Sequence, residues 1–219
     1  MLLIGIVGCS DNKDQKDGKE TNKEQTVNNN NENKDTDKSK DSENYQIPDY
    51  LGLTYEEPTY GYFINVPRFA GTREGGASLV FVDTSMFIAT GIVDSEYANI
   101  FKIDLNSIVK TEDIAPGIKN GMIAAATNTL EFDIADINFE SSKVMEVNGR
   151  EVCRFTGYLK LEEQYEGNKN YFVAGYTTFY NDMPMYIMAV NSHYIQNDET
   201  SKKVNQYVDD IIKTLRDKK

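Results

Sequence analysis

Histidine and cysteine are the side chains most often used for acid–base and nucleophilic catalysis, and the sequence contains few of either. Its only histidine is His193, and its two cysteines are Cys9 and Cys153. A histidine-based triad also needs an oriented nucleophile, and the sequence has no Gly-x-Ser-x-Gly motif. We therefore interpret His193 as a loop histidine. Cys153 shares one face of a predicted strand with Phe155, Leu159 and Leu161, which favours a small core residue over a nucleophile.

Carboxylates offer a second kind of chemistry. Glu131, Asp133 and Asp136 lie close together in the sequence and could bind Ca²⁺ through oxygen ligands. In a chain this acidic, a solvated charge cluster explains them better. Two acids that meet in space could also hydrolyse a glycosidic bond. A carboxylate-based envelope hydrolase therefore remains an alternative, although no motif supports it. We predict no metal or other cofactor.

The first nine residues form an unbroken apolar and small-residue run that ends at Gly8-Cys9, and the chain becomes polar after Ser10. The segment Ile6-Val7-Gly8-Cys9 resembles the lipobox of bacterial lipoproteins. The resemblance implies that residues 1–8 are a signal segment, that cleavage follows Gly8, and that the thiol of Cys9 carries a diacylglyceryl group. Two acyl chains on one residue suffice for a stable membrane anchor. We expect a protein held by this lipid on the extracytoplasmic face of the cell membrane.

The polar stretch that follows should not fold. Residues 10–44 consist almost entirely of Asn, Lys, Asp, Glu, Gln, Ser and Thr. Such a segment buries too little apolar surface to offset the entropy cost of ordering. We predict that residues 9–44 are the lipidated cysteine and a disordered linker, and that residues 45–219 form one globular domain.

The charge of the chain limits its partners. The net charge is -12, and residues 10–45 account for ten acidic and seven basic residues. Most of the negative charge therefore belongs to the predicted domain. An acidic surface repels phosphate backbones, so nucleic acid is not an expected partner.

Hydrophobic patterns predict the elements of the domain. Helices are predicted at 113–130, with a cap at Asp113, and at 201–216. Gly117 and Gly121 should let the first helix lie close to a sheet. Residues 69–78 are predicted to be a loop, and 95–109 remain unassigned. Strands are predicted at 60–66, 79–82, 87–93, 139–147, 151–162, 171–180 and 185–191.

The pattern also predicts how the strands are arranged. Asn148-Gly149 is a strong signal for a tight hairpin between residues 139–147 and 151–162. The strands at 171–180 and 185–191 are apolar on both faces, which predicts central positions covered from both sides. Consecutive hairpins with two amphipathic helices indicate an α+β fold in which helices flank an antiparallel sheet.

The order of these elements resembles the Mog1/PsbP-like domain. The resemblance covers about residues 60–215, and three segments carry it. These segments are residues 60–67, Asn148-Gly149-Arg150-Glu151 and Ile211-Ile212-Lys213-Thr214-Leu215. It implies an α/β/α sandwich that is mostly non-enzymatic and acts through protein contacts.

Tyrosines are the best candidates for such contacts. The chain has fourteen tyrosines and no tryptophan. Tyrosine combines a rigid apolar body with a polar tip and suits recognition surfaces. We select Tyr60, Tyr62, Tyr158 and Tyr176 as possible partner contacts, with half-buried strand packing as the competing explanation. The sequence thus predicts a lipid-anchored binding or adaptor module with a protein partner. The alternatives are the hydrolase and a small-molecule receptor.

Overall fold

The computed structural model describes residues 45–68, 71–75, 78–82, 86–130, 133–161, 170–191 and 198–218. Residues 1–44, with the predicted signal segment, Cys9 and the linker, lie outside this part of the chain. The predictions made for them are therefore not addressed by the fold.

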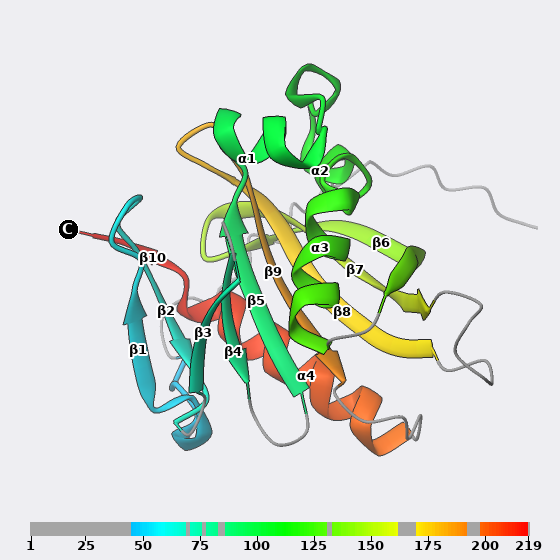
Figure 1. The fold of residues 1–219 in the computed structure, drawn as a ribbon. Coiled ribbons are helices and arrows are strands. Elements are labelled where there is room, and N and C mark those ends of the chain that lie inside the picture. The colour runs from blue at the N-terminus through cyan, green and yellow to red at the C-terminus, as the bar shows by residue number, and fades with distance from the viewer. Residues whose placement is uncertain are drawn as a thin grey trace, which may run out of the picture. The chain divides into compact units, whose positions relative to one another are not determined.

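A seven-stranded antiparallel sheet forms the centre of the described domain (Figure 1). Its spatial order is β3-β4-β5-β9-β8-β7-β6. The strands are β3 (Gly71–Gly75), β4 (Ser78–Val82), β5 (Met86–Ile92), β6 (Ile134–Val147), β7 (Arg150–Leu161), β8 (Asn170–Tyr180) and β9 (Met183–Asn191). The loop predicted for residues 69–78 is wrong, because β3 and the start of β4 pair there as a hairpin. Pairing with a neighbouring strand outweighs the weak strand preference of glycine.

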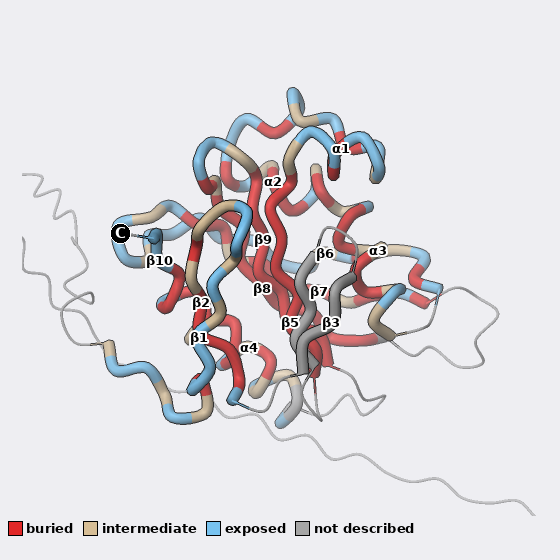
Figure 2. Tube along the Cα trace, turned by 60° about the vertical axis from the view of Figure 1, so that its left-hand side comes forward, coloured by how far each residue is buried: buried red, intermediate tan, exposed pale blue. Residues whose placement is uncertain are grey.

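The central strands are buried on both faces, as their sequences predict. Strand β9 is the fourth of seven, and residues 184–191 along it are all buried. Figure 2 shows β5, β8 and β9 buried at the middle of the sheet. A strand covered on both sides needs apolar residues at consecutive positions, and the sequence of β9 supplies them.

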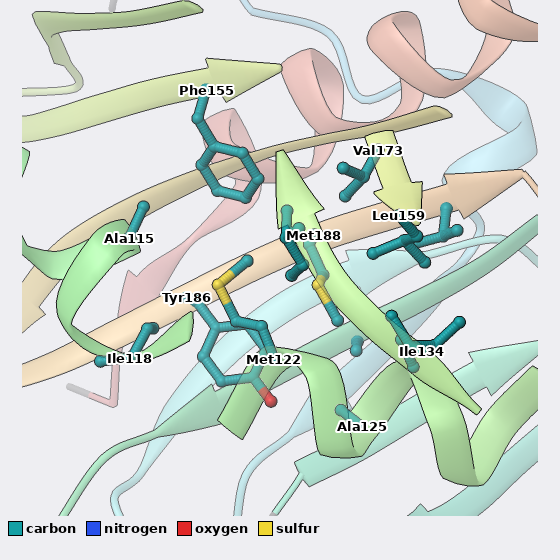
Figure 3. Packing of buried hydrophobic residues seen from close by; sticks show 14 of the residues in the cluster. Ala115, Ile118, Met122, Ala125, Ile134, Phe155, Leu159, Val173, Tyr186 and Met188 are labelled. Carbon is teal, nitrogen blue, oxygen red and sulfur yellow. The ribbon is translucent and has the colours of Figure 1, made fainter. Parts of the chain in front are cut away.

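Helices cover both faces of this sheet (Figure 1). One core packs β5, β7, β8 and β9 against α1 (Ser95–Phe101), α2 (Thr111–Gly117) and α3 (Lys119–Leu130), and Figure 3 shows part of it. The second core lies on the opposite face, beneath α4 (Asp198–Thr214). The predicted α+β class, with helices flanking an antiparallel sheet, is confirmed.

A small second sheet completes the α4 side. Its order is β1-β2-β10, with β1 (Leu53–Glu56), β2 (Tyr62–Val66) and β10 (Arg216–Asp217). Ile64 and Val66 of β2 belong to the core under α4. The sequence predicted β2 but neither of its neighbours, since four-residue and two-residue strands carry almost no periodic signal. Short 3₁₀ turns occur at Asp49–Leu51 and Leu105–Ser107.

The single helix predicted for residues 113–130 is two helices in the structure. Asp113 is the third residue of α2, and its carboxylate accepts hydrogen bonds from the amides of Lys110 (2.9 Å) and Val109 (3.3 Å). Because α2 starts at Thr111, Pro116 is its second-last residue and not part of its first turn. A proline at that position has no amide hydrogen to donate, which weakens the helix. At Ile118 the chain turns into α3.

The predicted role of Gly121 also needs correction. A Cβ atom at Gly121 would lie 2.4 Å from Cε1 of Tyr97. The glycine thus makes room for an aromatic ring of α1, not for a close approach to the sheet. By contrast, the Asn148-Gly149 hairpin is confirmed, because both residues have positive φ, 52° and 76°. That conformation is the one that a two-residue type I′ turn requires.

Asp94 links the second sheet to α1 and gives a pH-dependent prediction. Its carboxylate caps α1 by accepting from the amide of Tyr97 (2.8 Å), and it also accepts from the hydroxyl of Tyr60. The Tyr60 hydrogen bond, then the Tyr97 amide, lower the pKa of Asp94. A lowered pKa means that the contribution to stability is present above the ordinary aspartate pKa and is lost as pH falls through the folded-state value.

We expect Asp94→Ala to lower the free energy of unfolding by about 1 kcal/mol at neutral pH, the usual cost of losing a helix cap. The difference from the native chain should begin to shrink as the pH falls below about 4, the ordinary aspartate pKa, and should disappear only below the lowered pKa of Asp94 in the folded chain. Urea unfolding at a series of pH values measures both effects. A difference that stays constant down to the most acidic pH would show that the charge of Asp94 is not involved.

Candidate partner-binding groove

Several residues selected for possible chemistry are not brought together by the described fold. His193 and Glu131 lie outside the described residues. Asp133 is exposed, and Asp136 forms an ion pair with Lys119 (2.5 Å). Among the residues described, no group of three or more His, Cys, Asp or Glu side chains could hold a metal ion.

Cys153 lies where the alternation of β7 predicts, inside the core. Its side chain is a free thiol and the residue is 1% exposed. Burial raises the pKa of this thiol. A higher pKa leaves less thiolate, the form that reacts. The position is therefore that of a small core residue.

The four selected tyrosines are divided between core and surface. Tyr62 is 1% exposed and Tyr176 is 4% exposed, so neither ring is on the surface. Their hydroxyls contact Oγ1 of Thr90 (3.2 Å) and Oδ1 of Asp209 (2.9 Å). Both side chains are therefore packed within the fold on strands, β2 and β8, which is the competing explanation.

Tyr60 and Tyr158 are half-buried and remain accessible in part. Burial and the hydrogen bond to Asp94 raise the pKa of Tyr60 to about 12. Tyr158 packs edge-on against Phe172, with ring centroids 5.6 Å apart. A partner-contact role for these two residues stays a prediction.

A groove of about 530 Å³ lies where α4 ends, beside the turn between β6 and β7 and beside β10. We call it the α4–β10 groove. Three parts of the chain that are distant in sequence form its walls: the start of the described domain, the β6–β7 hairpin and the C-terminal segment. Its lining residues are Tyr45, Ile47, Val147, Asn148, Arg150, Val152, Ile212, Lys213, Thr214, Leu215, Arg216 and Asp217.

Cations outnumber carboxylates among the residues that line the groove, in a chain with a net charge of -12. Three cations line it, Arg150, Lys213 and Arg216, together with the carboxylate of Asp217. Two of the cations are already in ion pairs, Arg150 with Asp217 (2.9 Å) and Lys213 with Asp210 of α4 (3.4 Å). Concentrating cations in a concave surface strengthens the local field for an anionic partner. An anionic group is therefore the chemistry that this surface fits.

Internal contacts hold the two arginines in place. Arg150 forms an ion pair with Asp217 (2.9 Å) and lies over the ring of Tyr180, 5.3 Å from its centroid. Arg216 donates to Oδ1 of Asn65 (2.9 Å) and lies over the ring of Phe63. Side chains that are already ordered lose less entropy when a partner binds.

Aromatic residues attach the start of the domain to α4 and so build the third wall. The hydroxyls of Tyr45 and Tyr50 both donate to the carboxylate of Asp210. Tyr50 stacks on Tyr207 with ring centroids 4.7 Å apart, and Lys213 lies over Tyr45 at 5.0 Å. Burial, followed by the Asp210 charge and hydrogen bond, raises the pKa of Tyr45.

We expect Asp210→Ala to lower the free energy of unfolding by about 2 kcal/mol, because it removes the charged acceptor of two hydroxyl hydrogen bonds. Thermal or urea unfolding measures the change. Asp210→Asn keeps an acceptor and should cost less. Equal stability of Asp210→Ala and the native chain would mean that the wall formed by Tyr45 and Tyr50 is not held by this carboxylate.

Sequence reasoning missed the groove. The positive residues Arg150, Lys213 and Arg216 look like ordinary surface charges along the chain, and only the fold brings them together. One usable signal is present along the chain: a basic residue, Arg150, directly follows the Asn148-Gly149 turn, and another, Lys213, lies in the last turn of α4. That signal does not say which strand lies beside which helix.

The residues that line the groove include a single carboxylate, that of Asp217, and it forms an ion pair with Arg150. Hydrolysis by paired carboxylates requires two acids with separate roles, which the lining residues do not supply. The arrangement instead offers positive charge, some apolar surface and a strand edge, which suit binding.

Among the described residues, no helix is both long enough and apolar enough to span a membrane. No family model and no curated protein sequence matches the chain. Among solved structures, it is similar to the solution structure of cyanobacterial PsbP (CyanoP) from Synechocystis sp. PCC 6803. The TM-score is 0.45 at 8% sequence identity, over 75% of this chain and 91% of the other. This likeness concerns the layout of the fold and says nothing about a ligand.

Proposed function

We propose that this chain is a membrane-anchored, extracytoplasmic adaptor whose domain binds a protein partner in the α4–β10 groove without catalysing a reaction. The single observation that carries the binding proposal is the cluster of three cations in a concave surface of an acidic chain. Arg150 and Arg216 are fixed by internal contacts before any partner arrives.

The anchor is supported by the sequence of the first segment. The apolar run that ends at Gly8-Cys9 and the polar residues 10–44 fit a lipid attached to Cys9 and a linker. The described domain begins at Tyr45, on the wall of the groove. A partner bound there therefore lies beside Tyr45, which follows the last residue of the predicted linker.

A small-molecule receptor is the second candidate, and the size of the groove favours it. Ligand sites usually have volumes of about 300–1,000 Å³, and this groove measures about 530 Å³. Such sites are mostly apolar and enclose their ligand. The charge of this one favours a protein surface instead.

Site-specific photo-crosslinking in intact cells tests the adaptor proposal. Ile47 lines the groove and is 46% exposed, so a photoreactive phenylalanine can replace it without disturbing the core. Val109, which is 75% exposed and outside the groove lining, is the matched control. We expect a discrete protein adduct from position 47 and none of the same mass from position 109. Identical adducts from both positions, or none from position 47, would contradict the proposal.

A further inference from the structure

We propose, resting on the adaptor function above, that the α4–β10 groove binds an acidic peptide segment in an extended conformation, which pairs with the free edge of β10. The inference specifies the chemistry of the partner and the way in which it binds. The outer edge of β10, with which no other described strand pairs, and the residues that line the groove support it.

The backbone of β10 offers hydrogen-bonding groups. In the small sheet, β10 is an edge strand and pairs only with β2, with Arg216 opposite Phe63 and Asp217 opposite Tyr62. The amide of Lys218 donates to the carbonyl oxygen of Gly61 (2.9 Å). Along an antiparallel strand, the backbone N–H and C=O groups of one residue point toward the paired strand and those of the next residue point away from it. The N–H and C=O of Asp217 therefore point away from β2.

No other described strand pairs with that side of β10. Exposed strand edges are ready templates for another segment of chain. Because Asp217 also lines the groove, a peptide that pairs with it lies against the groove cations. The two main-chain groups of Asp217 would set the register of that peptide.

The charge specifies what kind of peptide fits. Lys213 lies in the last turn of α4, Arg150 follows the β6–β7 turn, and Arg216 starts β10. All three cations line the groove, which Asp217 of β10 also lines. Acidic side chains would meet opposite charge here and like charge over much of the rest of this acidic chain. The binding should therefore be local and sensitive to salt.

The apolar lining specifies the pattern of the peptide. The apolar residues of the lining include Ile47, which is exposed, Val147, which is half-buried, and Ile212 and Leu215, which are buried. Successive side chains of an extended peptide point to opposite faces. A segment that alternates acidic and β-branched residues can place its apolar side chains on this lining and leave its carboxylates beside the cations.

Fluorescence anisotropy with the full-length chain tests the inference. The probe is a labelled eight-residue peptide of alternating Glu and Val. The matched peptides alternate Lys and Val, or carry N-methyl groups on alternate amides so that they cannot donate to a strand edge. We expect the Glu-Val peptide to bind with a dissociation constant on the order of 10 μM and both controls to bind at least about tenfold more weakly, the factor that corresponds to 1.4 kcal/mol.

Variants of the protein test the same contacts from the other side. Asp217→Pro removes the outward N–H and should weaken binding about tenfold relative to Asp217→Asn, which keeps the N–H but also lacks the charge. Lys213→Gln should weaken binding, whereas Lys202→Gln should not. Lys202 is exposed on the same helix, eleven residues or about 16 Å away along the axis.

Every outcome decides for or against strand pairing. If the N-methylated peptide binds as tightly as the Glu-Val peptide, the groove does not use strand pairing and the inference is overturned. If an equal concentration of citrate displaces the Glu-Val peptide, the groove is only an anion site, and the inference is also overturned. Absence of binding by the Glu-Val peptide would overturn it as well. If the Ile47 crosslink persists in that case, the adaptor proposal stands with a partner of different chemistry. If the crosslink is also absent, both fail.

Discussion

Gly175→Ala should lower the free energy of unfolding by about 3 kcal/mol, at the upper end of the usual cost of overpacking a core. Gly175 lies in β8, next to the central strand of the sheet. A Cβ atom there would lie 2.5 Å from the carbonyl oxygen of Ile187 and 2.5 Å from Cζ of Phe155. The first is backbone of the neighbouring strand, and Figure 3 shows Phe155 within the packed core, so neither can move aside easily.

Urea unfolding followed by circular dichroism measures this change. Gly52→Ala is the matched control, since a Cβ atom there meets only the guanidinium end of Arg68, a flexible side chain. We expect the control to stay within about 0.5 kcal/mol of the native chain, as most surface substitutions do. A Gly175→Ala protein as stable as the control would show that β8 and β9 are not packed as described.

Cys9→Ser should abolish membrane association. The expectation rests on the proposed lipid at Cys9, because serine has no thiol to receive the diacylglyceryl group. Fractionation of cells into membrane and soluble material measures the effect, and we expect nearly all of the native protein, but almost none of the variant, in the membrane fraction.

Ser10→Ala is the control, since it alters the adjacent residue and leaves the thiol. The Cys9→Ser protein should also keep the unprocessed N-terminus and be heavier than the native polypeptide by the uncleaved segment. If Cys9→Ser stays in the membrane fraction with an unchanged mass, the lipid anchor is wrong, whatever the groove binds.

Local patterns were enough to predict the elements with strong periodicity. The Asn148-Gly149 turn was predicted because only a few residue pairs adopt positive φ twice in succession. Strand β9 was placed at the centre because its apolar residues occupy both faces. Helix α4 was predicted from an apolar stripe, and Val204, Val208, Ile211, Ile212 and Leu215 all lie in the core beneath it.

Elements that depend on their neighbours could not be predicted in the same way. Strand β3 forms because it pairs with β4, although its first and last residues are both glycines. The break between α2 and α3 places Gly117 against Ile108 and Gly121 against Tyr97, contacts that only the folded chain creates. Two of the selected tyrosines proved to be core residues for a related reason: tyrosine fits a buried strand as well as a surface.

The candidate groove depends entirely on tertiary structure. Ile47, Arg150 and Lys213 are far apart in sequence and meet only because α4 ends beside the β6–β7 turn. The net charge of -12 predicts an acidic surface and gives no sign of a cluster of cations. A local reversal of charge becomes visible only when side chains are placed in space.

The most direct measurement of whether this groove is the binding surface is the crosslink yield from position 47 in charge-reversed variants of the full-length, anchored protein. Lys213→Glu should lower the yield about tenfold, because it replaces attraction by repulsion within the groove, while Lys202→Glu on the exposed part of the same helix should leave it unchanged. A yield that Lys213→Glu leaves intact, or that both variants lower equally, would contradict the assignment of partner binding to the α4–β10 groove.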